Sequence, residues 1–359
     1  MPHALDRTAS YRSRSRQLVL ASLRSLAEQS RRGFAGGRAV DFPKSFLKID
    51  QVVMVGMGGS ALGSDVIRSV FFDRLKRPLS MVNGYDLPAA VSPRTLVVLS
   101  SYSGTTEEVL AVAESARRRR ARITGLTIGG ALGAWLRRHR LPWYQIDGGA
   151  NPAGQPRLGL GYSVMGQLGL LSSLGLVSIS GRTVARLADY LERRAWGFDI
   201  ARSKRVNAAK QLAASLRSSL PLLVGAEHLS GSVHAFANQL NETAKTLATP
   251  WQLPELNHHL LEGLRYPPAA QRATMVIFSS RLYRSRLVRR VRVTRELVER
   301  AGLSASVVPV QGGDRLTEAF DLLVLAGYTS LYLSVLHGVD PLAIPTVNEL
   351  KRRLGRAGR

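Results

Sequence analysis

Short apolar runs that end in a glycine- or serine-rich loop and lead into a helix recur along this sequence. In the first such unit, the run 51–55 ends at Gly56, and a helical apolar pattern follows over 61–72. Strands that alternate with helices in this way favour a parallel sheet covered by helices on both faces. The expected fold class is therefore α/β. The expected strands are 51–55, 95–99, 122–128, 221–224, 273–278 and 304–310.

The pattern restarts after two helical stretches, at 182–195 and 201–216, so the second half of the chain repeats the organisation of the first. A helix over 10–32 and a loop at 33–37 come before the first strand. Further helices are expected at 107–120, 162–176, 229–247, 285–301 and 317–336. The expected parts are an N-terminal helical segment at 1–35, a first domain at 36–182 and a second domain at 183–359 that ends in a helix.

Two long uncharged stretches, 158–181 and 322–339, are interpreted as buried helices and not as membrane spans. Glycines and serines interrupt the first of them. Residues 1–16 are polar and rich in arginine, without the apolar core of a secretory signal. We expect a cytoplasmic protein without a membrane partner.

The chain is strongly basic, with 50 lysines and arginines against 25 acidic residues and a net charge of +25. Such a charge suits an anionic ligand, either a polyanion or a small substrate. The arginines are scattered along the whole chain, which is also what a general preference for arginine would produce. Because the chain has no cysteine, disulfides, thiolate zinc sites and cysteine nucleophiles are excluded.

The first glycine loop, Gly56 to Ser60, fits the loose pattern of a dinucleotide-binding turn, which an acidic residue after the next strand should accompany. The run 80–83 ends in Asn83 instead. What remains is a loop that allows close backbone approach and offers the Ser60 hydroxyl and free amides to a phosphate. The alternative is a tight turn in which Ser60 only caps a helix.

The second loop, 100–106, carries serines and threonines between a strand end and a helix start. Two such loops after neighbouring parallel strands can close on one phosphate. No Walker lysine and no carboxylate suited to magnesium follow, so a phosphate monoester without a nucleotide is the expected ligand. The alternative is an ordinary capping box from Thr105 to Glu108.

These loops form part of an ordered set of motifs that resembles the bifunctional phosphoglucose/phosphomannose isomerase family over residues 45–355. The motifs are 56–60, 101–108, Gln155-Pro156-Arg157 with Gly161-Tyr162, 238–245 and 254–258. The resemblance implies two sugar isomerase (SIS) domains, each a parallel sheet flanked by helices in a flavodoxin-like three-layer architecture. It also implies interconversion of glucose 6-phosphate or mannose 6-phosphate with fructose 6-phosphate, without a metal or an organic cofactor.

The resemblance further implies roles for individual residues. Glu242 matches the catalytic base, Arg157 lies beside the reacting carbons, and His258 assists ring opening from the other subunit of a homodimer. Lys351, in the C-terminal helix, matches a lysine that also enters the site. The residues implied to bind the substrate phosphate are Gly59, Ser60, Ser101, Ser103 and Thr106.

The chemistry of these side chains suits the implied reaction. A carboxylate such as Glu242 can move a proton between C2 and C1, and a guanidinium such as Arg157 can stabilise the enediol oxygen. An imidazole such as that of His258 titrates near neutrality, as ring opening requires.

Each residue also has a simpler interpretation. Glu242 could be a surface carboxylate paired with Lys245, and Lys351 a solvated helix end. His258 and His259, followed by Glu262, could suggest a metal site, although adjacent histidines point in different directions and no third histidine has suitable spacing. No metal is therefore expected.

The sequence departs from the family pattern at two places. It has Asn257-His258-His259-Leu260 where Asn-His-Asn-Glu is usual, which leaves open which histidine faces the sugar. It also has Leu342-Ala343 where Thr-Pro is usual, which affects the relative use of glucose and mannose epimers.

A competing interpretation is a SIS-domain regulator that binds a phosphosugar without converting it. The arginine-rich segment 11–16 could then contact nucleic acid, but it is too short for a helix-turn-helix domain, and nucleic acid is not expected as a partner. A dinucleotide oxidoreductase has only the first glycine loop in its favour.

Overall fold

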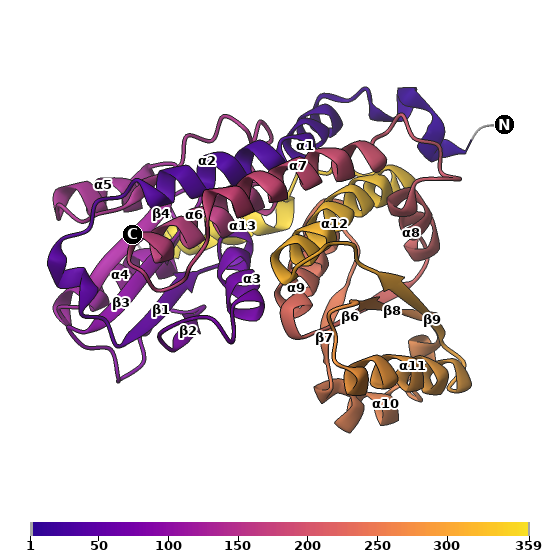
Figure 1. The fold of residues 1–359 in the computed structure, drawn as a ribbon. Coiled ribbons are helices and arrows are strands. Elements are labelled where there is room, and N and C mark those ends of the chain that lie inside the picture. The colour runs from indigo at the N-terminus through magenta and orange to yellow at the C-terminus, as the bar shows by residue number, and fades with distance from the viewer. Residues whose placement is uncertain (1–2, 358–359) are drawn as a thin grey trace.

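Two parallel sheets organise the molecule, which is described here by a computed structural model of residues 3–357 (Figure 1). The first sheet has the strand order β2-β1-β3-β4-β5 and the second the order β7-β6-β8-β9, with all neighbouring strands parallel. The two sheets lie on either side of residue 182 in the sequence. The strands are β1 (Gln51–Gly56), β2 (Leu79–Val82), β3 (Thr95–Ser100), β4 (Arg122–Thr127), β5 (Tyr144–Gln145), β6 (Leu220–Ala226), β7 (Thr249–Leu253), β8 (Ala273–Ser279) and β9 (Ser304–Pro309).

Helices cover both faces of each sheet, as the alternating pattern predicted (Figure 1). In β1, Val53 and Val55 pack with helix α4 while Val52 and Met54 pack with α3 and α6, since successive strand residues point to opposite faces. In the second unit, α9 and α12 cover one face and α11 the other. The helices are α1 (Arg14–Arg24), α2 (Leu26–Arg38), α3 (Leu62–Val70), α4 (Glu107–Arg118), α5 (Gly130–Arg138), α6 (Leu160–Ser173), α7 (Gly181–Gly197), α8 (Ala208–Leu216), α9 (Ser230–Gln239), α10 (Leu260–Gly263), α11 (Ser285–Arg300), α12 (Arg315–His337) and α13 (Pro345–Ala357).

The prediction of a loop at 33–37 is wrong, because these residues form the second half of α2. Its glycines let α2 approach α6 closely. A Cβ atom on Gly37 would lie 2.2 Å from the carbonyl oxygen of Gly166, and one on Gly33 would lie 3.0 Å from that of Gly161. The glycines therefore serve helix packing and not a turn.

Other expected boundaries also differ. The helix over 10–32 is divided at Ser25 into α1 and α2. Helix α8 starts only at Ala208, since the Asn207 side chain accepts a hydrogen bond from the amide of Lys210 and caps the helix there. Strand β7 was not expected, because Pro250 interrupts its pattern; it is the outer strand of its sheet, where proline is tolerated.

The long apolar stretches are core helices. Helix α6 is buried along nearly its whole length. Among the described residues, α12 alone is long and apolar enough to cross a membrane, but 89% of its most apolar window is buried inside the protein.

The two units are in close contact where α3 of the first meets α9 of the second. A Cβ atom on Gly231 would lie 2.4 Å from the carbonyl oxygen of Asp65. This packing fixes the carboxyl edge of the first sheet relative to the elements of the second unit that follow α9.

Candidate active site

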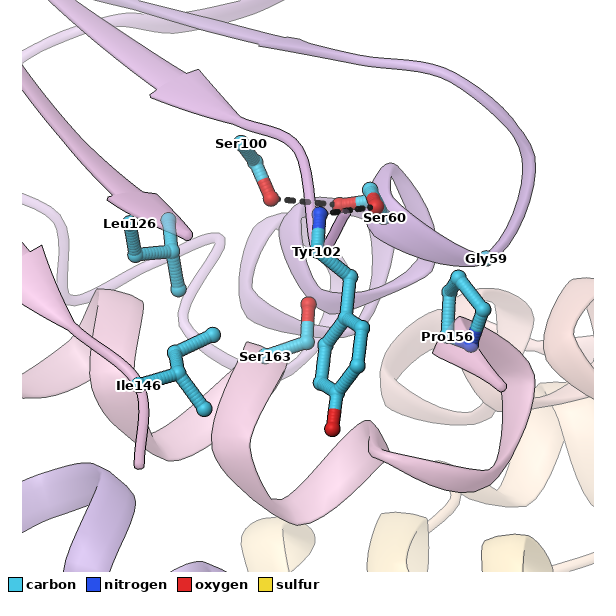
Figure 2. A pocket seen from close by; sticks show the side chains of 8 residues that line it. All are labelled: Gly59, Ser60, Ser100, Tyr102, Leu126, Ile146, Pro156 and Ser163. Carbon is cyan, nitrogen blue, oxygen red and sulfur yellow. Dashed lines mark hydrogen bonds between the residues drawn. The ribbon is translucent and has the colours of Figure 1, made fainter. Parts of the chain in front are cut away.

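The two hydroxyl-bearing loops lie side by side at the carboxyl edge of the first sheet. Strands β1 and β3 pair so that Gly56 lies beside Ser100. The hydroxyl of Ser100 donates to the carbonyl oxygen of Ser60 at 2.8 Å, and the Ser60 hydroxyl accepts from the amide of Tyr102 at 2.9 Å (Figure 2). The loops are therefore cross-linked by their own polar groups.

Glycines allow both loops to turn tightly. Gly58 and Gly104 have φ angles of 48° and 72°, in the left-handed region that favours glycine. A Cβ atom on Gly104 would also lie only 1.9 Å from the carbonyl oxygen of Gly129. The turns leave the serine and threonine side chains at the start of the following helices.

The hydroxyls of the second loop bond to one another. Ser101 Oγ and Thr106 Oγ1 are 2.7 Å apart, and Ser103 Oγ and Thr105 Oγ1 are 2.9 Å apart. Thr106 is the residue that caps α4, and its side chain makes no capping hydrogen bond. The N-cap residue of α4 is therefore Thr106 and not Thr105, and the Thr105 hydroxyl contacts Ser103, so the alternative capping box from Thr105 to Glu108 is not formed.

A small cavity of about 10 Å³ lies behind the first loop, between Gly59, Ser60 and the side chains around them (Figure 2). It is the size of about one water molecule. On the open side of the loops, Ser103 is exposed. The lining residues are Gly59, Ser60, Ser100, Tyr102, Leu126, Ile146, Pro156 and Ser163.

Gly59 brings Arg157 next to the first loop. A Cβ atom on Gly59 would lie 2.8 Å from the amide nitrogen of Arg157 and 2.9 Å from Cβ of Pro156. The turn Pro156–Leu158 therefore packs directly against the loop, and only glycine leaves room for it.

The guanidinium of Arg157 is fully buried and joins three segments of the chain. Its Nη1 donates to Glu242 Oε2 at 2.9 Å, its Nε to Thr243 Oγ1 at 3.0 Å and its Nη2 to the carbonyl oxygen of Pro341 at 2.8 Å. Nη1 also donates to Gln155 Oε1. Burial lowers the pKa of Arg157, and the neighbouring Glu242 carboxylate opposes that shift. These hydrogen bonds and the Glu242 carboxylate compensate the burial of the positive charge, and they hold Glu242 in a fixed orientation.

Glu242 lies in a π turn, Leu240–Ala244, which directly follows α9. Such turns are frequent at functional sites. The turn ends at Lys245, whose φ of 56° is uncommon for a residue other than glycine. The Glu242 side chain is 26% exposed, so one side of its carboxylate is open to a ligand.

Lys245 does not pair with the carboxylate of Glu242. Its Nζ donates to the backbone carbonyl oxygen of Glu242 at 2.6 Å, while Arg157 takes the carboxylate. Burial, followed by the charge of Arg157, lowers the pKa of Lys245. The interpretation of Glu242 as a surface carboxylate paired with Lys245 is therefore wrong. Lys245 was not predicted to belong to the site, although it stands three residues after Glu242.

His258 is distant from this group in the topology of the second sheet. Glu242 precedes β7 and His258 follows it, so the two residues lie beyond opposite ends of this strand. His258 is exposed in the short turn Glu255–His258. Within one chain, the structure does not bring His258 to Glu242.

The neighbouring His259 is held by its own chain. Its ring centroid lies 5.8 Å from that of Trp251, and its Nε2 lies 3.9 Å from Glu255 Oε1. Asn257 Nδ2 donates to Thr294 Oγ1 at 2.8 Å and ties the turn to α11. No group of three or more histidine and acidic side chains suited to a metal ion occurs among residues 3–357.

Lys351 lies on α13, which turns back toward the first unit (Figure 1). The side chain of Lys351 is exposed and makes no hydrogen bond to Glu242 or Arg157. Val347, Leu350 and Leu354 form an apolar stripe on this helix and are 40%, 56% and 51% exposed. The helix is therefore poorly covered by its own chain.

Comparisons with known proteins find relatives along almost the full length of the chain. Residues 205–354 match the family model of the bacterial phospho-glucose isomerase C-terminal SIS domain. The bifunctional phosphoglucose/phosphomannose isomerase of Caldicellulosiruptor bescii is 31% identical over 94% of this chain and 98% of its own length. The protein of the same description from Thermoplasma volcanium is 27% identical over 88% of this chain and 95% of its own.

Solved structures share the fold at low sequence identity. A hypothetical protein from Thermus thermophilus superposes with a TM-score of 0.70 at 18% identity, covering 96% of this chain and 93% of its own. The C-terminal domain of glucosamine-fructose-6-phosphate aminotransferase from Francisella tularensis has a TM-score of 0.68 at 12% identity, covering 93% and 99%. These likenesses support the architecture of two flanked parallel sheets.

Proposed function

The chain belongs to the bifunctional phosphoglucose/phosphomannose isomerase family, and on that basis we propose that it interconverts fructose 6-phosphate with glucose 6-phosphate and mannose 6-phosphate. Its two sheets are then those of two SIS domains, which we divide near residue 182. We also propose that the enzyme works in the cytoplasm.

The observation that carries this proposal is the Arg157–Glu242 pair beside the two hydroxyl loops. The phosphate of the substrate would bind at Ser60, Ser101, Ser103 and Thr106, where hydroxyls and helix-start amides are available. The opposite end of the sugar then extends toward the open side of the Glu242 carboxylate. This placement holds the reacting carbons against a fixed base.

Glu242 is the proposed base for the proton transfer. It takes the proton from C2 of the aldose, and the electron pair of the C–H bond forms the C1–C2 double bond while the carbonyl oxygen gains a proton. Return of the proton to C1, with loss of the C2 hydroxyl proton, gives the ketose. The positive charge of Arg157, whose N–H groups are bonded within the chain, stabilises the negative charge that develops on the enediol oxygens. The reaction is an internal redox exchange, so no external cofactor is needed.

His258 is proposed to act from a second copy of the chain. A sugar ring must open before the proton transfer, and a neutral imidazole suits the proton exchange at the ring oxygen. Because His258 and Glu242 lie beyond opposite ends of β7, a homodimer is needed to bring a histidine to the site of the carboxylate. Of the two histidines, His258 is proposed for this task because Trp251 and Glu255 engage His259.

The C-terminal helix supports the same assembly. The apolar stripe of α13 is uncovered in the single chain, and a partner subunit would bury it. Arg157 binds the backbone at Pro341, a few residues before this helix. We propose that Lys351 enters the site when α13 is fixed in the dimer.

Turnover of fructose 6-phosphate in the presence of EDTA tests the proposal. The sugar phosphates are separated by chromatography after incubation with the purified protein, and Glu242→Gln protein serves as the control. We expect glucose 6-phosphate and mannose 6-phosphate to form with the unchanged chain only. Binding of the ketose without any product would instead identify a phosphosugar-binding regulator.

A further inference from the structure

The second SIS domain repeats the backbone of the first hydroxyl loop. The strand orders β2-β1-β3-β4 and β7-β6-β8-β9 make β6 the equivalent of β1 and β8 the equivalent of β3. A short 3-10 turn follows each of the inner strands, Gly58–Ser60 after β1 and Glu227–Leu229 after β6. These turns begin at Gly58 and Glu227, with φ angles of 48° and 45°. The left-handed turn is therefore the same in both domains, although the second has Glu227 where the first has Gly58.

The second domain also keeps a serine at the end of the other inner strand. Ser280 follows β8 as Ser101 follows β3. Ser101 Oγ accepts from the amide of Gly104 at 3.1 Å, and Ser280 Oγ accepts from the amide of Leu282 at 2.8 Å. Both hydroxyls are therefore held by an amide of their own loop, and the hydrogen of the Ser280 hydroxyl is free for a further acceptor.

In the second domain that acceptor is a carboxylate of the same chain. Glu318, in the first turn of α12, accepts a hydrogen bond from Ser280 Oγ on its Oε2 atom. The same oxygen lies 2.7 Å from Nε2 of His228, which occupies the place of Gly59 in the turn. The side chains of Glu318 and His228 are each only 1% exposed.

The other nitrogen of the His228 ring has no partner among the described residues. His228 Nδ1 is buried and has no hydrogen-bond partner in the part of the chain that the structure describes. Leu229 stands where the first domain has Ser60, so the second domain has no hydroxyl there. A buried carboxylate needs hydrogen bonds and an opposite charge or dipole. Ser280 and His228, from the two loops of the second domain, supply the contacts to Glu318.

We infer that the carboxylate of Glu318 fills the anion site of the second SIS domain as a built-in substitute for phosphate. The intact chain then has a single phosphate site, in the first domain. Removing this carboxylate, with Ser280 and His228 left in place, should open a second site for inorganic phosphate. This inference concerns a site other than the active site and does not depend on isomerase activity.

Equilibrium dialysis with inorganic phosphate tests the inference on the full-length protein. Glu318→Ala should bind about one equivalent per chain more than the unchanged protein, and its Tm should rise with phosphate concentration beyond the rise seen for the unchanged protein. The measured quantity is the additional phosphate bound by Glu318→Ala, so the test works even if the first-domain site does not bind phosphate.

A neighbouring carboxylate supplies the matched control. Asp321 lies on the same helix, is 1% exposed, and is bound by Arg194, by the hydroxyl of Tyr190 and by the amide of Gln311. Asp321→Ala removes a buried carboxylate without opening the proposed site, so it should gain no phosphate. Glu318→Gln should also gain none, because its amide still fills the space.

The inference is contradicted if folded Glu318→Ala binds no more phosphate than the unchanged protein, or if Asp321→Ala gains as much. If Glu318→Ala is unfolded in phosphate-free buffer, addition of phosphate should restore its far-UV circular dichroism. A variant that stays unfolded at saturating phosphate overturns the inference as well.

Discussion

The guanidinium of Arg157 and the carboxylate of Glu242 are joined by a 2.9 Å hydrogen bond although 85 residues separate them in the sequence. Arg157 follows the first sheet, and Glu242 lies in the π turn that follows α9 in the second unit. The contact therefore assembles one site from both halves of the chain.

Gly59→Ala should impair catalysis without unfolding the protein. The added methyl group would lie 2.8 Å from the amide nitrogen of Arg157, so the turn that carries Arg157 must move away from the first loop. A displacement of this size is expected to lower kcat/KM by about 10²-fold. Steady-state kinetics and circular dichroism check this result. Gly84→Ala is the control, because nothing lies within 4 Å of its added methyl group. Equal kcat/KM values for the two variants would contradict the claim that close packing of the Arg157 turn against Gly59 is needed for catalysis.

His258→Ala should lower kcat by about 10²-fold, whereas His259→Ala should have a smaller effect, because only the first loses the proposed proton-transfer group.

Mixing two kinds of inactive subunit tests whether His258 acts across the dimer interface. Dimers carrying only Glu242→Gln or only His258→Ala should each be nearly inactive, but a mixed dimer contains one complete site.

After unfolding and refolding an equimolar mixture, we expect about a quarter of the activity of the unchanged dimer, because random pairing makes half the dimers mixed and each has one complete site of two. Sedimentation analysis of the same samples verifies dimer formation. Dimers that recover no activity would show that His258 does not act across the interface.

The lowered pKa of Lys245 predicts that the free energy of unfolding depends on pH. Burial and the charge of Arg157 lower its pKa from the ordinary value of 10.5, so the folded protein holds this proton less tightly than the unfolded chain does. The free energy of unfolding should therefore rise as the pH increases from the lowered pKa toward 10.5. Lys245→Gln should remove this alkaline gain.

Urea unfolding at a series of pH values above neutrality measures the difference between the two proteins. Lys44→Gln, at an exposed lysine, controls for the loss of one positive charge. The same alkaline gain in Lys245→Gln as in the unchanged protein would count against the shift.

Leu342→Thr should change the ratio of the two aldose products. The carbonyl oxygen of Leu342 lies 3.4 Å from Nη2 of Arg157, so this residue borders the site. A threonine hydroxyl offers a partner to a sugar hydroxyl that leucine leaves unpaired, and we expect the share of mannose 6-phosphate to rise by about 2-fold or more. Product analysis from fructose 6-phosphate gives the ratio directly, and an unchanged ratio would remove Leu342 from the determinants of epimer choice.

The sequence was informative where local chemistry dictates structure. Apolar runs that end in glycine or serine predicted the inner strands β1, β3, β6 and β8, since these strands are buried on both faces. The hydroxyl loop before α4 was also recognisable, because helix starts leave free amides. These features need only a few consecutive residues to be read.

Other features depend on distant contacts. The glycines of α2 read as a loop, because only the closeness of α6 shows why they are needed. Pro250 hid β7, and its position at the outer edge of the sheet is known only from the topology. Likewise, the sequence positions of Arg157 and Glu242 do not predict that the two side chains are in contact. The family resemblance, and not periodicity, singled out both residues.

The most direct test of the account is proton exchange during turnover. The purified protein and the Glu242→Gln variant are incubated with fructose 6-phosphate in deuterated water and EDTA, and NMR follows the aldose products and deuterium at C2. We predict glucose 6-phosphate and mannose 6-phosphate with solvent deuterium at C2, and a rate about 10³-fold lower for the variant. Near-normal turnover by the Glu242→Gln variant, or no product and no exchange from the folded, ligand-binding protein, would contradict the account.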